Sequence, residues 1–156
     1  MTFRVELDKK SLKKLEKDLE HQQHLFEQNL LAYMGAEAVS LIRDRVAKGI
    51  GSDDKPMEKY SPSYEAYKKS KGRDTSKRDL VFSGRMMGSV TVDGPFQEAN
   101  GSHVIVTFGG GPSIQIQASK NEERTPFFGL SKKDTELLKG AVERFMKAYF
   151  ERNQKR

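Results

Sequence analysis

The sequence contains no cysteine, which excludes disulfide bonds and thiolate zinc sites. It also has no apolar run approaching the ~18 residues that a membrane-spanning helix needs. The first ten residues, MTFRVELDKK, lack the basic-then-apolar organisation of a signal peptide. We therefore expect a protein that is made in the cytoplasm and has no membrane partner.

The composition sets limits on the size and the surface of the fold. A chain of 156 residues is of ordinary single-domain size, so we expect one domain over residues 1–156. Apolar residues make up 35% and charged residues 32%, which indicates extensive exposed helix surface or a mobile stretch. The net charge of +6 favours polyanionic partners, but this charge is also common in proteins that contact only other proteins.

A search for catalytic chemistry finds little. There are three histidines and no Gly-x-Ser-x-Gly motif, and no carboxylate pair is marked out by its position. The glycine-rich TFGGGPS has no lysine and does not lead into a predicted helix, so we interpret it as a flexible sheet connection rather than a phosphate loop. His21 and His24 are spaced to share a metal, but without a third ligand a solvated helix face is the better interpretation. We therefore expect that the protein is not an enzyme and that it binds no cofactor or metal.

The first third of the chain has helical periodicity. Apolar residues recur at spacings of three, four or seven from Asp8 to about Val46. Asp8 is a plausible N-cap, and Gly49 and Gly51 follow where a helix should end. A helix of roughly 55 Å exceeds what a small domain can cover, so we expect either a break, at Gly35, or a projecting end. Before it, TFRVEL alternates like a short strand at a sheet edge.

The middle of the chain is rich in glycine, proline, serine and charge. SPSYEAYKKS predicts one short helix, with Ser61 as cap and Pro62 at its first position. From Lys68 to Arg78 there are six basic residues, one acid and no apolar residue. Burial cannot offset the ordering entropy of such a stretch, so we expect a mobile basic loop over 68–78. One interpretation is an electrostatic arm that binds either DNA phosphates or the acidic surface of another protein. The other interpretation is a solvated loop without a partner.

The last part of the chain alternates like strands and then turns helical. SVTVDGPF and HVIVTFGG flank Asn100-Gly101, a hairpin signal, and SIQIQA predicts a third strand. Ser131 and Asp134 form a capping-box pair before a helical stripe that runs from Leu137 to Tyr149. The predicted fold is α+β, with a long N-terminal helix, a small antiparallel β-sheet and a C-terminal helix packed on the sheet. The core-facing strand residues are predicted to be Val90, Val92, Val104 and Val106.

Two segments, taken in order, resemble a known family. DLVFSGRMMGSVTV, residues 79–92, is similar to the Leu-x-x-(Thr/Ser)-Gly-Arg-Leu-x-x-Ser pattern of the phage virion morphogenesis family, which comprises tail-completion and related neck proteins of tailed phages. RTPFFGLSKKD, residues 124–134, resembles the Arg-x-Phe-Leu-Gly-Leu-Ser-x-x-Asp that precedes the last helix of that family. Met57, Met86 and Phe128 depart from the family pattern.

The resemblance implies a structural virion protein. It would be made in the host bacterial cytoplasm and would act at the head-proximal end of a phage tail, in tail completion or head-tail joining, as a ring that contacts other tail or neck proteins. The alternative is a basic DNA-binding or packaging accessory protein. In the SGR segment we expect Ser83 to cap one helical turn, with Met86 and Met87 packed inward. The candidate interface residues are Lys68, Lys69, Lys71, Arg73, Lys77, Arg78, Arg85, Arg124, Phe127 and Phe128.

Overall fold

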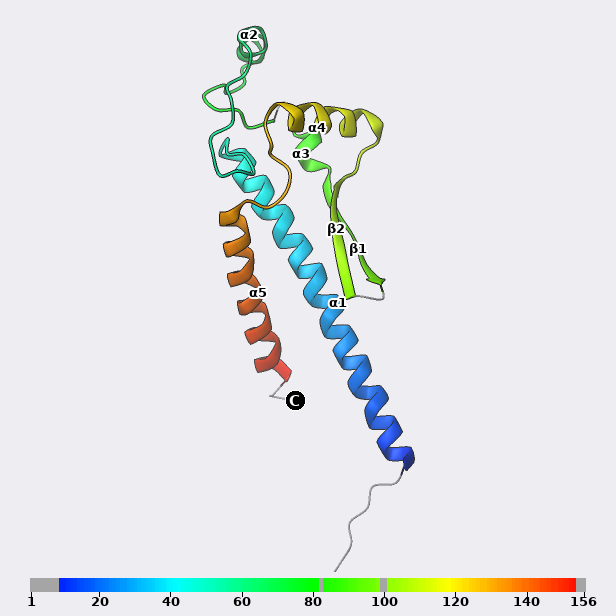
Figure 1. Ribbon diagram of the computed structural model, residues 1–156. Coiled ribbons are helices and arrows are strands. Elements are labelled where there is room, and N and C mark those ends of the chain that lie inside the picture. The colour runs from blue at the N-terminus through cyan, green and yellow to red at the C-terminus, as the bar shows by residue number, and fades with distance from the viewer. Residues whose placement is uncertain (1–8, 82, 99–100, 154–156) are drawn as a thin grey trace, which may run out of the picture.

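The computed structural model describes residues 9–81, 83–98 and 101–153 (Figure 1). The element order is α1 (Lys9–Ala47), α2 (Pro62–Ser70), α3 (Arg85–Gly88), β1 (Val90–Glu98), β2 (Gly101–Phe108), α4 (Pro112–Arg124) and α5 (Lys132–Asn153). The α+β class is confirmed, with its long N-terminal helix, antiparallel sheet and C-terminal helix. The predicted strand TFRVEL, the cap Asp8 and Asn100 of the hairpin turn lie outside the described residues.

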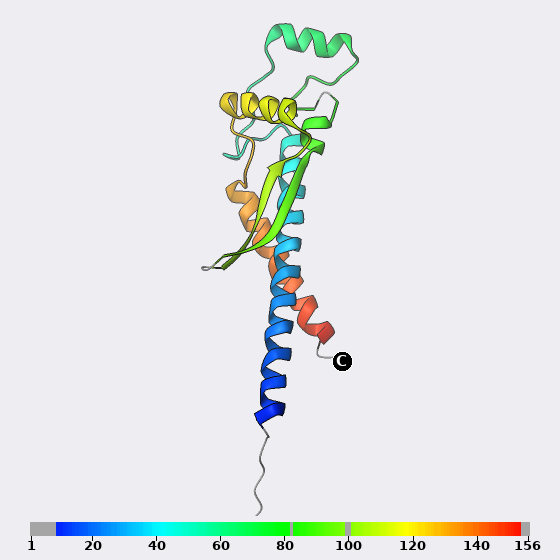
Figure 2. The ribbon, with the colours of Figure 1, turned by 90° about the vertical axis from the view of Figure 1, so that its right-hand side faces the viewer.

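Helix α1 is continuous, so the predicted break at Gly35 is wrong. Its 39 residues span roughly 58 Å at 1.5 Å per residue. Gly35 instead allows the sheet to approach the helix. A Cβ at this position would lie 2.6 Å from Cγ1 of Val92. The N-terminal part of α1 extends beyond all other elements, which fits the projecting end that the sequence offered as the second possibility (Figures 1 and 2).

The predicted hairpin is confirmed. Strands β1 and β2 are antiparallel, with Val90 opposite Phe108 and Val92 opposite Val106, and the register shifts between Asp93 and Phe96. The predicted inward face is also correct, because Val90 is buried and Val92 and Val106 pack partly buried against the core. Among the described residues the sheet has these two strands only, so each strand has one partner.

The predicted third strand, SIQIQA, is wrong, because these residues belong to helix α4. Pro112 occupies its first turn, where the missing N–H of proline costs nothing. Ile114 and Ala118, four residues apart, are buried, whereas Ile116 is 56% exposed. The isoleucine alternation indicated a strand, but only Ile114 faces the core, and the helical spacing to Ala118 defines the buried side.

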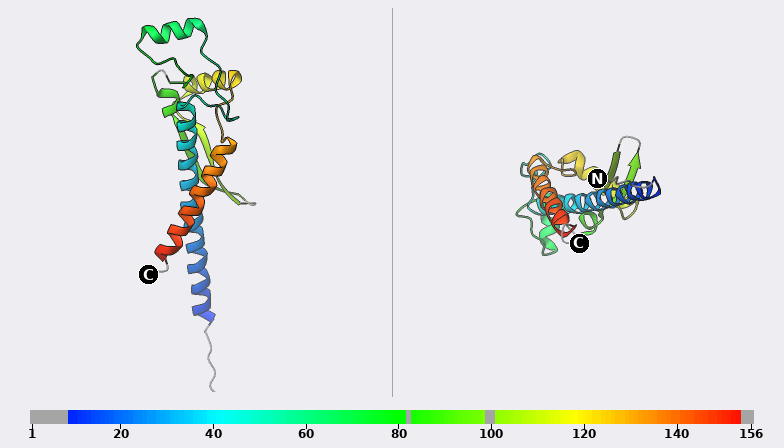
Figure 3. Two further views of the ribbon diagram at one scale, coloured as in Figure 1. Left: turned by 90° about the vertical axis from the view of Figure 1, so that its left-hand side faces the viewer. Right: turned by 90° about the horizontal axis from the view of Figure 1, so that it is seen from below.

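Helix α5 packs against α1, which differs from the expectation that it would lie on the sheet. Helix α1 lies between the two, with α5 on one side and the hairpin on the other (Figures 1 and 3). The predicted stripe of α5 makes this contact through ring pairs: Phe145 stacks on Tyr33 at 4.8 Å, and Tyr149 meets Phe26 at 4.7 Å. A two-stranded sheet is too narrow to receive two long helices on one face, so the apolar side of α5 is buried by α1.

The core lies at the C-terminal end of α1. It joins Val39, Ile42 and Val46 of α1 to buried residues from the loops, α3, β1 and α4, which are Met57, Leu80, Met86, Met87, Val90, Ile114, Ala118 and Phe127. The basic middle segment and α2 sit beyond this core, at the end of the molecule opposite the projecting part of α1 (Figure 1). The protein therefore has one packed end and one extended end.

Candidate functional site

The two segments that carry the family resemblance meet in the same core. Met86 and Met87 of the first segment and Phe127 of the second are all buried in the cluster at the end of α1. Helix α3 of the first segment also contacts α4, which leads directly into the second. Both segments therefore contribute to the same junction between α1, the sheet and α5.

The SGR segment forms the predicted single helical turn, but its N-cap is Gly84 rather than the expected Ser83. The Oγ of Ser83 accepts a hydrogen bond from the N–H of Arg85 at 3.4 Å, and Gly84 has the positive φ of 76° that favours glycine. Met86 and Met87 point inward, as expected. Arg43 of α1 holds the end of this turn, since its guanidinium donates to the carbonyls of Met87, Gly88 and Val90 at 2.8–3.1 Å.

The RTPFFG turn is fixed from both sides of its backbone. The N–H groups of Phe127 and Phe128 both donate to Oε2 of Glu122, at 2.9 Å each. The carbonyls of Phe127 and Gly129 accept hydrogen bonds from Nη2 of Arg45. These carboxylate and guanidinium contacts are charge-assisted, which makes them stronger than ordinary backbone hydrogen bonds.

Arg45 also connects this turn to the start of α5. Its Nε donates to Oδ2 of Asp134 at 2.6 Å, and both side chains are nearly inaccessible to solvent. The predicted capping box is confirmed: the N–H of Asp134 donates to Oγ of Ser131, and the N–H of Ser131 donates to Oδ2 of Asp134. One buried arginine thus fixes the C-terminal end of α1 and the turn relative to the N-terminus of α5.

The two phenylalanines of the turn occupy different environments. Phe127 is completely buried, whereas Phe128 is partly exposed. Both rings lie against Phe108 at the end of β2, with centroid distances of 6.1 and 4.6 Å. The turn therefore pins the chain leading into α5 to the sheet. Phe127 is a core residue and is not available to a neighbouring subunit, while Phe128 keeps a solvent-facing part.

The basic segment 68–78 is anchored at its first residue. Lys68 is 1% exposed, and its Nζ donates to Oδ1 of Asp79 at 2.8 Å and to the hydroxyl of Tyr60 at 3.1 Å. Burial raises the pKa of Asp79, but hydrogen bonds from Lys68, the N–H of Val81 and Tyr60 outweigh it and hold that pKa below its usual value. Burial likewise raises the pKa of Tyr60. Lys68 is therefore a structural cation rather than part of an exposed arm.

The last residue of the segment is anchored as well. Arg78 is 6% exposed and donates to Oγ1 of Thr125 and Oδ1 of Asn121, at 3.1 Å each. Between the two anchors, Lys69, Lys71, Arg73 and Lys77 are exposed. Lys69 pairs with Glu65 at 2.6 Å, and Lys71 lies over the ring of Tyr67. Two of the six predicted cations are consequently withdrawn from the surface.

The remaining two predicted arginines are exposed. Arg85 stands on the surface at the start of α3, so of the two roles that the sequence left open, surface charge or buried partner, it has the first. Arg124 is exposed at the end of α4 and lines a cavity together with Arg78. The structure thus brings Arg78 and Arg124 together, whereas Arg85 is not among the residues that line this cavity.

Arg43 and Arg45 organise the junction, and the sequence analysis did not single them out. Arg45 lies 89 residues from Asp134, so their pairing carries no local signal. The available hint is the phase of the helix: Arg45 falls beside Ile42 and Val46, on a side of α1 that the apolar pattern marks as buried. A charged residue in such a position requires a buried partner.

The described part of the chain meets the requirements of neither a metal cluster nor a membrane-spanning helix. In residues 9–81, 83–98 and 101–153 there is no group of three or more metal-ligating side chains. His21 and His24 are exposed, and Nδ1 of His24 lies 3.0 Å from the amide nitrogen of Gln97. None of the helices in this described part is long and apolar enough to cross a membrane.

Comparisons with known proteins yield no relative. No family model matches the chain, and no curated protein or solved structure is significantly similar to it. The resemblance to the phage virion morphogenesis family therefore rests on the two motifs and their order along the chain.

Proposed function

We propose that this protein is a structural virion assembly protein that acts at the head-proximal end of a phage tail, in tail completion or head-tail joining, as a ring of identical subunits. The observation that carries the proposal is the family-like pair of segments, 79–92 and 124–134, which this chain uses to build one junction between α1, the sheet and α5. Around that junction the protomer is extended rather than closed (Figure 2). Both features suit a subunit whose remaining contacts come from neighbours.

The extended end supplies surface for such contacts. The buried residues of α1 fall between Gly35 and Val46, while residues 17, 18 and 20–34 are exposed or half-buried. Large apolar side chains are also exposed along the protomer, including Leu25, Phe96, Ile105, Ile116, Leu137 and Phe150. A ring requires two different surfaces that meet head to tail and close by rotation. Apolar patches on an elongated subunit favour that kind of contact.

The free edges of the hairpin are our candidate subunit contact. Within the described residues each strand has a single partner, so each has an outer edge whose backbone groups can pair with another chain. An added strand would gain main-chain hydrogen bonds. The segment TFRVEL of a neighbouring copy has the alternation required for this role.

DNA binding is the competing function, and the burial of two cations weakens it. Lys68 and Arg78 are committed to internal contacts, and Lys69 is paired with Glu65. Fewer free cations mean fewer phosphate contacts, which supply most non-specific affinity for DNA. The exposed Lys71, Arg73 and Lys77 remain as the DNA-facing candidates.

The experiment that separates the two functions is a mass measurement by light scattering on a sizing column, with and without duplex DNA. It should be run at about 50 and about 200 mM salt, a range over which affinity that depends on phosphate contacts falls by orders of magnitude. We expect a multi-subunit species that persists at both salt concentrations and ignores DNA, because apolar contacts are not screened. A monomer that shifts onto DNA only at the lower salt would contradict the proposal.

A further inference from the structure

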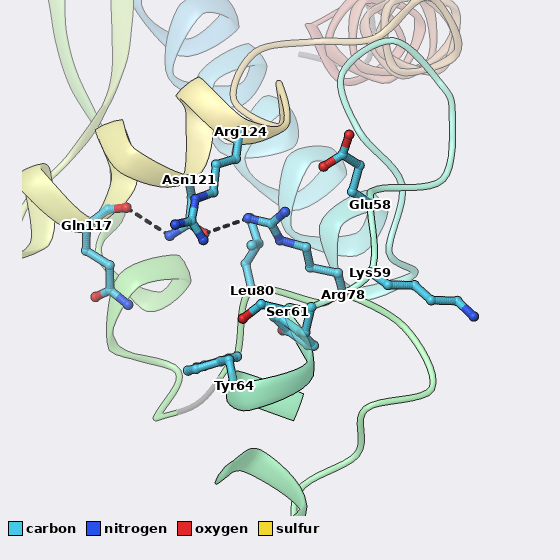
Figure 4. A pocket seen from close by; sticks show the side chains of 10 residues that line it. Glu58, Lys59, Ser61, Tyr64, Arg78, Leu80, Gln117, Asn121 and Arg124 are labelled. Atoms are coloured by element: carbon cyan, nitrogen blue, oxygen red, sulfur yellow. Dashed lines mark hydrogen bonds between the residues drawn. The ribbon is translucent and has the colours of Figure 1, made fainter. Parts of the chain in front are cut away.

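A polar cavity lies between the segment before α2 and one face of α4 (Figure 4). Its volume is about 560 Å³. Gln117, Asn121 and Arg124 line one wall, at positions of α4 spaced by four and three residues, so they share one helix face. Residues 58–61 with Tyr64 line the other wall, and Arg78 and Leu80 lie between them.

Arg78 is a buried cation with an incomplete set of hydrogen bonds. Its guanidinium donates only to Thr125 and Asn121, both neutral, and its buried Nε has no hydrogen-bond partner in the described structure. Within this same part of the chain no carboxylate forms an ion pair with it, unlike the other two buried cations, Arg45 and Lys68. Buried charges in proteins are ordinarily paired. The missing ion pair of Arg78 therefore indicates that an anionic ligand could bind beside it.

A second arginine increases the positive potential of the cavity. Arg124 lines the same space, and no hydrogen bond or ion pair to the described residues occupies its side chain. Burial is the largest effect and lowers the pKa of Arg78; the charge of Arg124 lowers it as well, whereas Tyr60 and Glu58 raise it. The two guanidinium groups therefore lie close enough to repel each other. An anion bound between them would remove that repulsion.

We propose that the cavity between Arg78 and Arg124 is a carboxylate-binding site, which takes the acidic side chain or the terminal carboxylate of a protein partner. The planar fork of Arg124 matches a carboxylate in bidentate fashion. Tyr64 and Leu80 offer apolar surface to the carbon chain that bears the acid. Glu58 at the same cavity disfavours the greater negative charge of a phosphate, which makes a protein carboxylate the better fit than a nucleic acid. The site stands independently of the virion role.

The test uses nuclear magnetic resonance of the full chain, observing the side-chain Nε–H signals of arginine. The probes are a capped Gly-Glu-Gly peptide, its Gly-Gln-Gly counterpart and inorganic phosphate, each titrated to about 50 mM, well above the millimolar dissociation constants typical of a few charge-assisted contacts. Arg124→Gln is the informative variant, because Arg124 is exposed and its loss spares the core. Arg85→Gln removes another exposed arginine, which lies outside the cavity, and serves as the matched control.

We expect the glutamate peptide to shift the Arg78 and Arg124 signals saturably, and the glutamine peptide to leave them unchanged. Arg124→Gln should weaken the dissociation constant of the glutamate peptide by about tenfold, the effect of losing one charge-assisted contact, while Arg85→Gln should leave it unaltered. Tighter binding of phosphate than of the glutamate peptide would overturn the assignment in favour of a phosphate site. Signals that ignore the glutamate peptide, or equal affinity in the two variants, would also overturn it.

Discussion

Replacing Gly35 with alanine tests how the sheet is seated on α1. Gly35 lies inside a continuous helix, where alanine is normally preferred by about 1 kcal/mol. The new methyl group would lie 2.6 Å from Cγ1 and 3.1 Å from Cγ2 of Val92, and 3.4 Å from Cγ2 of Val104. Val92 cannot turn aside easily, because a β-branched side chain is restricted at χ1 and its backbone pairs with Val106. The sheet must therefore move.

The expected magnitude follows from two opposing effects. Overpacking a well-packed contact costs about 1–3 kcal/mol, whereas the gain in helix propensity returns about 1 kcal/mol. We expect a net destabilisation of about 1 kcal/mol, since the contact with Val92 is far shorter than van der Waals distance. Gly140 of α5 provides the matched control, because a methyl group there meets only the flexible end of Arg144, at 3.4 Å. Gly140→Ala should stabilise the protein by up to about 1 kcal/mol.

Urea unfolding of both variants at one pH provides the assay. The free energies of unfolding should change with opposite sign, and truncating the opposing residue with Val92→Ala should relieve the penalty of Gly35→Ala by about 1 kcal/mol in a double-mutant cycle. If Gly35→Ala stabilised the protein as much as Gly140→Ala, or if the cycle showed no coupling, the close seating of the sheet on α1 would be refuted.

Three further changes test the junction and the anchored loop. Asp134→Ala leaves Arg45 buried without its carboxylate, and we expect a loss of about 3–5 kcal/mol in urea unfolding. Phe127→Ala should cost about 3–5 kcal/mol in the same measurement, because the ring is completely buried, and Phe128→Ala clearly less. Asp79 has a pKa below its unfolded value, so its contribution is fully present above about pH 4 and is lost as pH falls through the folded pKa. The difference in unfolding free energy between wild type and Asp79→Asn should therefore shrink as a pH series descends toward pH 2.

Each of these expectations has its own contrary result. For Asp134 the control is Glu136→Ala, which removes an exposed pair with Lys139 and should cost less than about 1 kcal/mol; equal losses would show that burial of the Arg45 pair is unimportant. Equal losses at Phe127 and Phe128 would contradict their different environments. A pH-independent difference for Asp79→Asn would mean that its ionised form is not stabilised by folding.

The elements that the sequence predicted well have strong periodicity or specific punctuation. The stripe of α1, the hairpin signal at Asn100-Gly101 and the Ser131/Asp134 box each indicated a local structure that sequence spacing alone can specify. The strand prediction for SIQIQA failed because two alternating isoleucines are too short a pattern to distinguish a strand from a helix. The helical pair Ile114 and Ala118 depends on α4 lying over the core, a tertiary fact.

The site was harder to predict because its contacts span the chain. Lys68 and Arg78 appeared as parts of a solvated basic stretch, since nothing near them in sequence announces burial. The partner of Lys68 is Asp79, which directly follows the basic stretch but resembles any other surface acid in the sequence. The partners of Arg78 are Asn121 and Thr125, which lie more than 40 residues away. Charge runs reveal the sign of a segment, whereas burial depends on what folds over it.

Negative-stain electron microscopy of the concentrated protein tests most directly whether the subunits assemble into a closed ring, as proposed. We expect closed rings of uniform diameter at moderate salt without DNA, because heterologous apolar contacts close by rotation. Fields that contain only single elongated particles at the highest attainable concentration, or particles that gather only along added DNA, would contradict it.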